Sequence, residues 1–311
     1  MRWICYSKKD RKPIYLTREM FESDTLNRPP FTYNYRNYAV CPACLNPVQI
    51  IGVKTELRNT PEPYAKHTTE EIPGLDAVID EVSYRNCPYA DPNSRQKNQR
   101  YTLRSPSYLS KLIIELFWTQ LDRIFYIIER ELPISIPWHL KKQILKDFVG
   151  YKGWRHPEIT LLNVPWMLLY CSNYYPLWRC EIKDEKLRLA ISKIKGVEFE
   201  ENNTNVIKHD GRDGLGFCVI HHRIFRGEHA NIRESINFVV AKNLDQWFFQ
   251  KGILDISPSN EILFSKTLEI KADYFYNLTH PSNPQYEKAH KRALQNILPL
   301  LEQVHFPKMQ N

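Results

Sequence analysis

The spacing of apolar residues divides the chain into three stretches. Up to about residue 100, short β-branched runs alternate with prolines and show no helical period, which predicts small strands and loops. The stretch that follows opens with Ser105, which can cap a helix, and Pro106, which suits its first turn. Apolar residues then recur every three or four positions and mark one helix face: Leu109, Ile113, Leu116, Phe117, Leu121, Ile124 and Ile128.

Two further helical patterns, at about 139–149 and 184–195, make the middle of the chain helical. After about residue 205 the pattern changes, and short β-like runs alternate with turns before a last helix over about 284–303. Sheet first and helix last is an α+β arrangement. The predicted divisions are therefore 1–104, 105–200 and 201–311.

Four residues of the first stretch can bind a metal ion. Cys41 and Cys44 form a Cys-Pro-Ala-Cys sequence, and two thiolates at this spacing can hold one tetrahedral ion if a second pair joins them. His67 and Cys87 are the candidates for that pair, which gives a Cys3His zinc site. The alternative is two buried cysteines in a tight turn. We expect a closed, structural Zn²⁺ site that makes 1–104 a small zinc-binding module and performs no catalysis.

The zinc motif also resembles part of a known family. "CPAC…PYAKH", within residues 41–70, is similar to the amino-terminal zinc module of the CoiA-like competence proteins. The chain has 7 cysteines, an odd number, and "MRWICYSKKDRKPIY" lacks the apolar run of an export signal. These features predict a reduced, cytoplasmic protein whose cysteines are metal ligands or core residues.

Charge favours a polyanionic partner. The net charge is +8 and the isoelectric point is near 9.0, which suits nucleic acid, although a membrane surface attracts the same charge. The most apolar stretch, which begins at Ser107, is interrupted by charged residues, so we expect no membrane span. One basic segment, 94–104, is either a solvated linker or a phosphate-binding strip around Tyr101 that consists of Arg95, Lys97, Arg100 and Arg104.

The stretch "DGLGFCVIHHRIF" (213–225) places two adjacent histidines near a cysteine. Its alternation is also that of a buried strand whose histidines only form hydrogen bonds. The stretch nevertheless resembles the HNH endonucleases, in particular the bacterial restriction-type branch, and with "QKGILDISPSNEILFSKTL" and "HPSNPQYEKAHKRAL" the likeness extends over about 205–295.

The HNH resemblance implies a ββα-metal domain over 201–311. It implies that His222 is a metal ligand at the start of a helix, with His209 as general base and Asp210 as a second ligand of Mg²⁺ or Mn²⁺. His221 would support this site or face the other way. Three departures weaken the match: Asp213 replaces an asparagine, Arg226 replaces an aspartate, and only 12 residues separate His209 from His222.

A rival nuclease pattern occurs later in the chain. Asp255 and the Glu269-Ile270-Lys271 sequence have the outline of a PD-(D/E)xK site. If "SPSN" (257–260) forms a hairpin turn, however, Asp255 lies opposite Ile262, and Glu269 is too far along the strand to share a metal ion.

Two functional hypotheses follow. The first is a metal-dependent endonuclease, a hydrolase that cleaves DNA rather than RNA, which the resemblance associates with bacterial restriction or antiviral defence. The second is a non-catalytic, zinc-containing nucleic-acid-binding subunit of a larger complex. A small-ligand sensor is disfavoured, because the chain has only 10 glycines and no glycine-rich phosphate loop.

Overall fold

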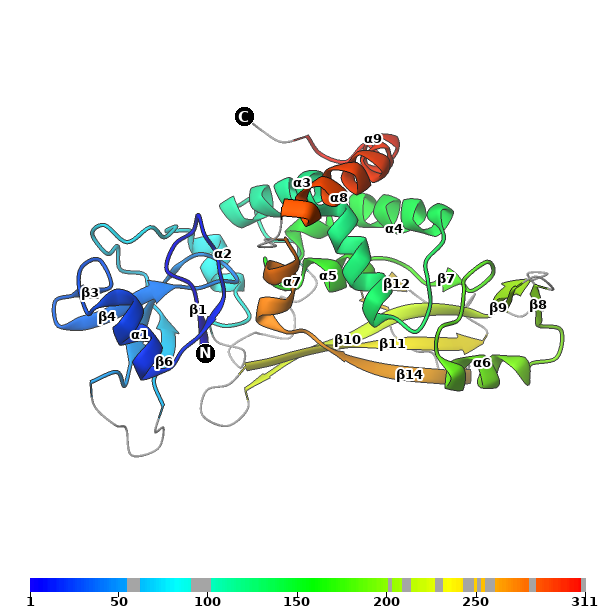
Figure 1. Cartoon of the computed structure of the whole chain (residues 1–311), viewed down its shortest axis with the longest axis horizontal. Coiled ribbons are helices and arrows are strands. Elements are labelled where there is room, and N and C mark those ends of the chain that lie inside the picture. The colour runs from blue at the N-terminus through cyan, green and yellow to red at the C-terminus, as the bar shows by residue number, and fades with distance from the viewer. Residues whose placement is uncertain are drawn as a thin grey trace.

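The fold is α+β, as the sequence predicts. The computed structural model describes residues 1–54, 62–90, 102–200, 203–208, 214–226, 232–242, 249–250, 253–254, 261–279 and 284–308. In Figure 1 residues 1–54 and 62–90 form a module at the left, and the later described residues stack helices above a long twisted sheet.

The amino-terminal module is built from short strands, with two short helices that the apolar pattern did not predict. Thr17 caps the first of these helices and Asp80 caps the second. Four of the strands form one antiparallel sheet in the order β3-β4-β5-β6. The elements are β1 (Trp3–Ile4), β2 (Ile14–Tyr15), α1 (Arg18–Thr25), β3 (Thr32–Tyr33), β4 (Arg36–Val40), β5 (Pro47–Ile51), β6 (Tyr64–His67) and α2 (Glu81–Asn86).

The middle of the chain is helical, and the three predicted helices are present. The first helix begins two residues later than predicted. Ser107 rather than Ser105 is its cap and accepts a hydrogen bond from Ser110 N. The helix is interrupted at Gln120, whose backbone is not helical. The elements are α3 (Tyr108–Glu131), α4 (Trp138–Tyr151), the 3₁₀ turn η2 (Gly153–Arg155), α5 (Val164–Tyr170), β7 (Tyr175–Pro176) and α6 (Glu185–Ser192).

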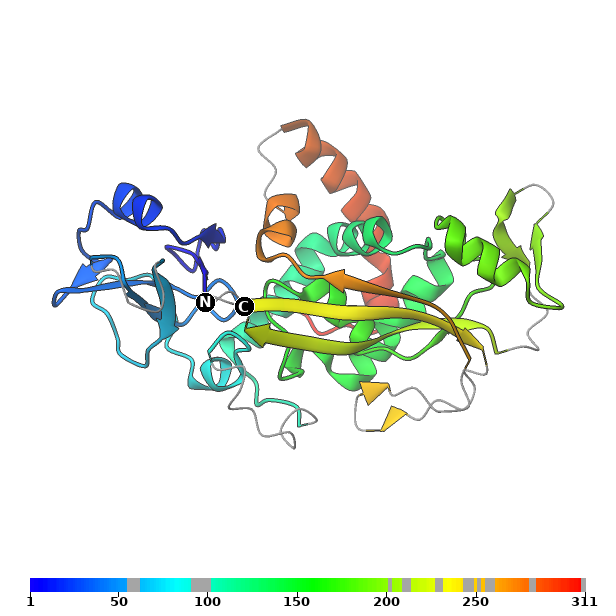
Figure 2. The same cartoon turned by 90° about the horizontal axis from the view of Figure 1, so that it is seen from below.

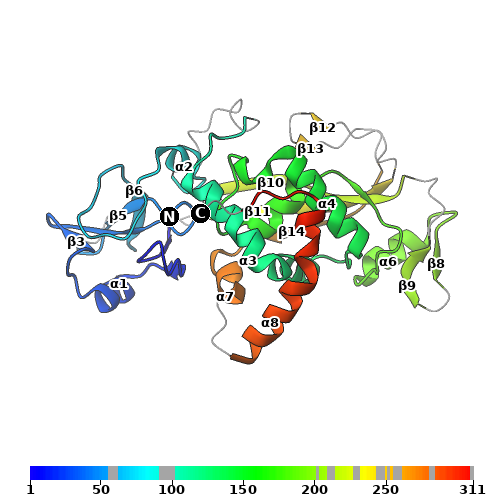
Figure 3. The ribbon, with the colours of Figure 1, turned by 90° about the horizontal axis from the view of Figure 1, so that it is seen from above.

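The carboxy-terminal stretch supplies the long strands of the second four-stranded sheet, whose order is β14-β11-β10-β7. The helices that follow lie back against the middle of the chain, with α8 beside α3 (Figure 3). The elements are β8 (Glu198–Glu200), β9 (Asn203–Lys208), β10 (Gly216–Arg226), β11 (Ile232–Lys242), β12 (Phe249–Gln250), β13 (Ile253–Leu254), β14 (Glu261–Glu269), α7 (Ala272–Thr279), α8 (Pro284–Ile297) and α9 (Pro299–Gln303).

The hairpin turn predicted at 257–260 lies outside the described residues, and the strands on either side of it pair with other strands. Strand β14 pairs with β11, so that Ile262 lies opposite Ala241, while β13 pairs with β12. Asp255 lies outside the described residues. The predicted separation of Asp255 from Glu269 therefore stays a prediction.

The predicted boundary at residue 200 does not separate two cores. Strand β7 belongs to the middle stretch, yet it pairs with β10 at the edge of the carboxy-terminal sheet. Helices α3, α5 and α8 pack with this sheet into one continuous cluster of buried apolar residues. In Figure 2, seen from below, the strands lie in front of the helices. None of the helices in the described ranges combines the length and apolar character that a membrane span requires.

A β-bulge at His221 decides which face of the sheet the next residue reaches. The pairing of β10 with β11 shifts between Ile220 and Arg223, and His221 has a left-handed backbone (φ 55°). Phe217 and Val219 face the helices before the bulge, and His222 faces them after it. Without the extra residue, His222 would point to the opposite face.

We expect His221→Gly to fold with nearly unchanged stability and His221→Val to lose about 1–2 kcal/mol, because a β-branched side chain strongly disfavours positive φ. Chemical denaturation measures both free energies of unfolding. Arg223→Val, at an exposed position on the same strand, is the control and should cost little. Equal losses for both valine variants would contradict the role assigned to the bulge.

Candidate metal centre and a buried histidine–carboxylate cluster

The Cys-Pro-Ala-Cys sequence forms the tight connection between β4 and β5. Leu45 N donates to Cys41 O at 2.8 Å and Cys41 N donates to Asn46 O at 2.9 Å, which closes the turn. Leu45 takes a left-handed backbone (φ 61°) that turns the chain into β5. Cys41 and Cys44 therefore face the same point from two corners of one rigid loop.

The other two candidates come from separate elements. His67 is the last residue of β6 and lies opposite Val48 in the sheet. Cys87 ends α2, where its N–H donates to Tyr84 O. The four ligand atoms of Cys41, Cys44, His67 and Cys87 lie within 4.8 Å of one another, so the sequence identified all four members of this cluster.

The spacing of the four atoms fits a tetrahedral ion. The Cys41 and Cys87 sulfurs are 3.9 Å apart, and Cys44 Sγ is 3.3 Å from His67 Nε2. Zinc–sulfur bonds of about 2.3 Å place two tetrahedral sulfurs about 3.8 Å apart. All four residues are buried, with no side left open for a substrate. The cluster can hold a metal such as zinc, and its geometry is that of a closed structural site.

The electrostatics of the cluster favour one thiolate. Burial, together with the neighbouring thiols, raises the pKa of Cys41 and burial raises the pKa of Cys87. Burial also opposes ionisation of Cys44, but hydrogen bonds from the other two thiols and the nearby His67 ring lower its pKa well below the ordinary value. Asn46 Nδ2 lies 3.5 Å from the Cys44 sulfur and supports that charge. A bound cation would extend the same stabilisation to all three sulfurs.

The remaining cysteines belong to the core, in agreement with the expectation of free thiols. All are buried and none is in a disulfide: Cys5, Cys171, Cys180 and Cys218.

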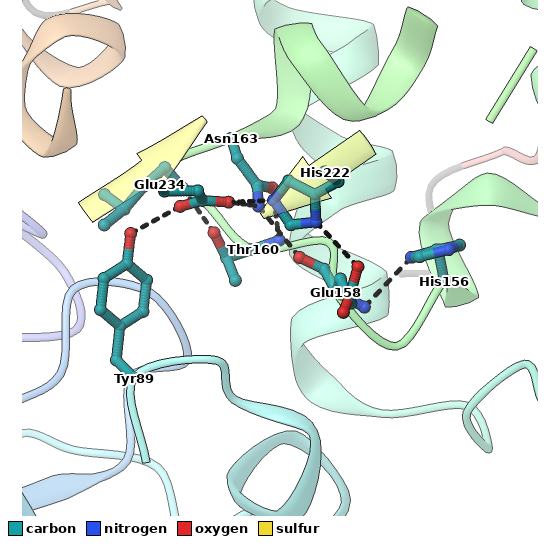
Figure 4. Close-up of polar contacts among 8 residues, drawn as sticks. Tyr89, His156, Glu158, Thr160, Asn163, His222 and Glu234 are labelled. Carbon is teal, nitrogen blue, oxygen red and sulfur yellow. Dashed lines mark hydrogen bonds and ion pairs between the residues drawn. The ribbon is translucent and has the colours of Figure 1, made fainter. Parts of the chain in front are cut away.

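His222 is enclosed by two carboxylates. Its Nδ1 lies 2.8 Å from Glu158 Oε2 and its Nε2 lies 2.7 Å from Glu234 Oε1, on opposite sides of the ring (Figure 4). The exposed fraction of the His222 side chain is 0%, and that of Glu234 is 1%. The Tyr170 ring packs beside the imidazole, with the centroids 5.6 Å apart.

The structure corrects the role predicted for His222. The residue lies in the middle of strand β10 rather than at the start of a helix, and both of its ring nitrogens are already engaged. An imidazole binds a metal ion through a free nitrogen lone pair, which this arrangement does not provide. The only set of three or more clustered metal-ligand residues in the described part of the chain is the cysteine site.

Hydrogen bonds complete the buried cluster around Glu234. Asn163 Nδ2 donates to Glu234 Oε1 at 2.6 Å, and Tyr89 Oη donates to Glu234 Oε2 at 2.7 Å. Asn163 also donates to the backbone oxygen of Glu158, so one amide links the two acids. We name Glu158, His222, Glu234, Asn163 and Tyr89 the buried His–Glu cluster.

The buried His–Glu cluster requires a charged imidazole. Burial alone would lower the pKa of His222, but the hydrogen bonds and charges of Glu158 and Glu234 outweigh it and raise the pKa to about 9. Burial and the adjacent Glu234 carboxylate raise the pKa of Tyr89, which keeps its hydroxyl a donor. At neutral pH the imidazolium therefore donates to both acids and compensates one of their two charges.

Sequence reasoning did not find the partners of His222. Glu158 lies 64 residues before His222 and Glu234 lies 12 residues after it, and no motif spacing relates either acid to the histidine. The sole local signal is that Glu158 and Asn163 lie in a largely apolar stretch before α5. Burial of an acid in such a stretch requires a partner, but the sequence does not identify it.

The other predicted residues fall into two groups. His221 is exposed and points away from the cluster that holds His222. Outside the described residues lie His209, Asp210, Arg95, Lys97 and Arg100.

Arg104 lies within the described residues, and its predicted role as a phosphate contact is wrong. Its guanidinium is buried and donates to Ile159 O at 3.1 Å and Trp154 O at 3.0 Å. Burial lowers the pKa of Arg104 to about 10. The side chain therefore holds two backbone segments together instead of facing solvent.

Comparison of the chain with protein-family models, with curated proteins and with solved structures finds no match in any of the three.

For the metal centre, we expect purified protein to contain about one zinc ion per chain and Cys87→Ala to lose it, because a closed site needs all four ligands. Elemental analysis measures the zinc content. Cys171→Ala removes a buried thiol from the core and should retain the metal. Zinc-free wild-type protein, or equal zinc in both variants, would show that the cluster is a set of core thiols.

For the buried His–Glu cluster, we expect His222→Gln to lose about 3–5 kcal/mol of unfolding free energy near pH 6.5, because it leaves two carboxylates without their cation. The folded pKa of His222 is raised, so its contribution is complete below its unfolded pKa of about 6.5 and is lost as the pH rises through 9. The difference in unfolding free energy between His222→Gln and wild type should thus become smaller between pH 6.5 and 9.5. Denaturant titrations across this range measure it.

His221→Gln is the matched control, because it removes the adjacent exposed imidazole. Its stability should follow wild type at every pH. A gap for His222→Gln that stays constant with pH would mean that the imidazole is neutral in the folded protein.

Proposed function

We propose that this chain is a nucleic-acid-binding protein with a structural zinc centre and no cutting centre at His222. The observation that carries the proposal is the enclosure of His222 between Glu158 and Glu234. This leaves the second of the two hypotheses, the non-catalytic binding protein, in better agreement with the geometry than the nuclease.

The chemistry of an HNH-type centre explains the choice. Such a centre needs an imidazole that coordinates a divalent ion and a path by which a phosphodiester reaches it. The His222 side chain is inaccessible, and its two nitrogens form hydrogen bonds within the core. A cutting centre that uses Mg²⁺ or Mn²⁺, and a role in bacterial restriction or antiviral defence, remain predictions of the HNH resemblance.

Support for nucleic acid as partner comes from charge. The excess of Lys and Arg gives a net charge of +8, and phosphate neutralisation supplies affinity that requires no base-specific pocket. The closed metal site serves such a protein by stabilising a module whose strands are short. More specifically, we propose that the nucleic acid is DNA rather than RNA and that the protein is a subunit of a larger complex.

We expect the purified protein to bind oligonucleotides with an affinity that falls steeply with salt and to leave plasmid DNA and RNA uncut with Mg²⁺ or Mn²⁺. Fluorescence anisotropy at several salt concentrations measures binding, and gel electrophoresis measures cleavage. Cleavage that needs a divalent ion and disappears in a folded His222→Gln variant would overturn the proposal. Absence of binding at low salt would overturn it equally.

A further inference from the structure

A cavity of about 560 Å³ opens where the start of α3, the turn after α4 and the last described residues meet. Its volume lies in the range of about 300–1,000 Å³ that is usual for ligand sites. We name it the basic cavity, after the cationic side chains that line it together with Glu115 and Trp154: Lys111, Lys152, Arg155 and Lys308.

The turn at 152–155 forms one wall of the basic cavity, and close packing fixes its path. Lys152 ends α4 with a left-handed backbone (φ 57°). A side-chain carbon on Gly153 would lie 2.1 Å from the ring of Phe148, so only glycine fits there. Lys152 and Trp154 therefore lie on either side of a glycine that packs closely against the Phe148 ring.

The end of the chain forms the opposite wall and is anchored in the core. The ring of Phe306 is buried, and its centroid lies 5.7 Å from that of Trp154. Trp118 Nε1 donates to Pro307 O at 2.7 Å. These contacts place Lys308 at the cavity and fix one side of the Trp154 ring, while the same ring lines the cavity.

Arg155 is positioned by the buried Arg104. The Nε of Arg155 donates to Arg104 O at 2.8 Å, and Arg104 N donates to Arg155 O at 2.9 Å. The Arg104 guanidinium also donates to Trp154 O. Arg104 therefore contributes to the basic cavity from behind, as a support for two of its lining residues.

The charges of the basic cavity are unbalanced. Four cationic side chains face one carboxylate, that of Glu115. Among the described residues, no carboxylate forms an ion pair with Lys111, Lys152 or Lys308. The amino terminus of α3 adds little positive potential to the cavity, because the backbone N–H of its first residue, Tyr108, already donates a hydrogen bond to Asp80.

We propose that the basic cavity binds a phosphodiester of single-stranded nucleic acid, with Lys111, Lys152, Arg155 and Lys308 around the phosphate and an unpaired base against Trp154. Cations that converge from separate segments suit a phosphate, and an aromatic ring beside them suits a base that is not paired. The site rests on the proposed function and narrows it to single strands.

The experiment uses the full chain with a labelled single-stranded oligonucleotide, measured by fluorescence anisotropy at several salt concentrations. The site variant combines Lys152→Asn, which tolerates the left-handed backbone, with Lys308→Gln. The control combines Lys186→Gln and Lys195→Gln, exposed lysines in and just after α6, and removes the same charge. Thermal melting verifies that both variants are folded.

We expect the site variant to bind roughly tenfold more weakly than wild type, and its salt slope to fall by about 1.4, the value for two lost contacts to a single strand. The control should retain wild-type affinity. Duplex DNA of the same sequence should bind more weakly than the single strand, and inorganic phosphate should compete only at high concentration.

Each other outcome overturns a distinct part of the proposal. If wild type binds and both variants match it, or both lose affinity equally, the basic cavity is not the site although the proposed function stands. If duplex binds as tightly as single strand, stacking on Trp154 is wrong. If wild type binds no nucleic acid, the proposed function fails and the site with it.

Discussion

The buried ion pair of His222 with two glutamates is the constraint on which the arrangement of this fold depends. Two carboxylates in a protein core cost several kcal/mol unless a cation and hydrogen-bond donors compensate them. The two acids lie in the loop before α5 and in β11. The compensation comes from His222 in β10, from Asn163 at the start of α5 and from Tyr89 in the amino-terminal module. The segments must meet in one register, because any slip would leave a charge uncompensated in an apolar interior.

Tyr89 joins this cluster to the metal centre. It lies two residues after Cys87, and its hydroxyl reaches Glu234, 145 residues away in sequence. A module of short strands has little apolar surface of its own, so an ion bound by the cysteine–histidine cluster would hold α2 and the following turn in place. The position of Cys87 fixes that of Tyr89, and through it the module docks on the central sheet. Ion binding at Cys87 would thus be coupled to the docking of the module through Tyr89.

Local patterns predicted the features whose determinants are local. The apolar spacing predicted helix α3. The two-residue spacing of Cys41 and Cys44 predicted a metal site, and His67 and Cys87 were the candidates for its second pair of ligands. The partners of His222 could not be predicted, because burial of Glu158 and Glu234 is a tertiary property. The bulge was equally invisible: a left-handed histidine has no sequence signature, yet it reverses the face on which every later residue of β10 lies.

In this chain the burial of a side chain, rather than its residue type, distinguishes a structural role from a functional one. A histidine beside acids has the composition of a catalytic site, and an arginine in a basic segment has that of a phosphate contact. Both His222 and Arg104 are buried, however, and their polar atoms form hydrogen bonds within the protein core. What Arg104 supports, however, is the backbone of Trp154 and Arg155, which line an open cavity. In the proposed site Arg104 therefore acts indirectly, because it positions Arg155, a half-buried cation that lines the cavity.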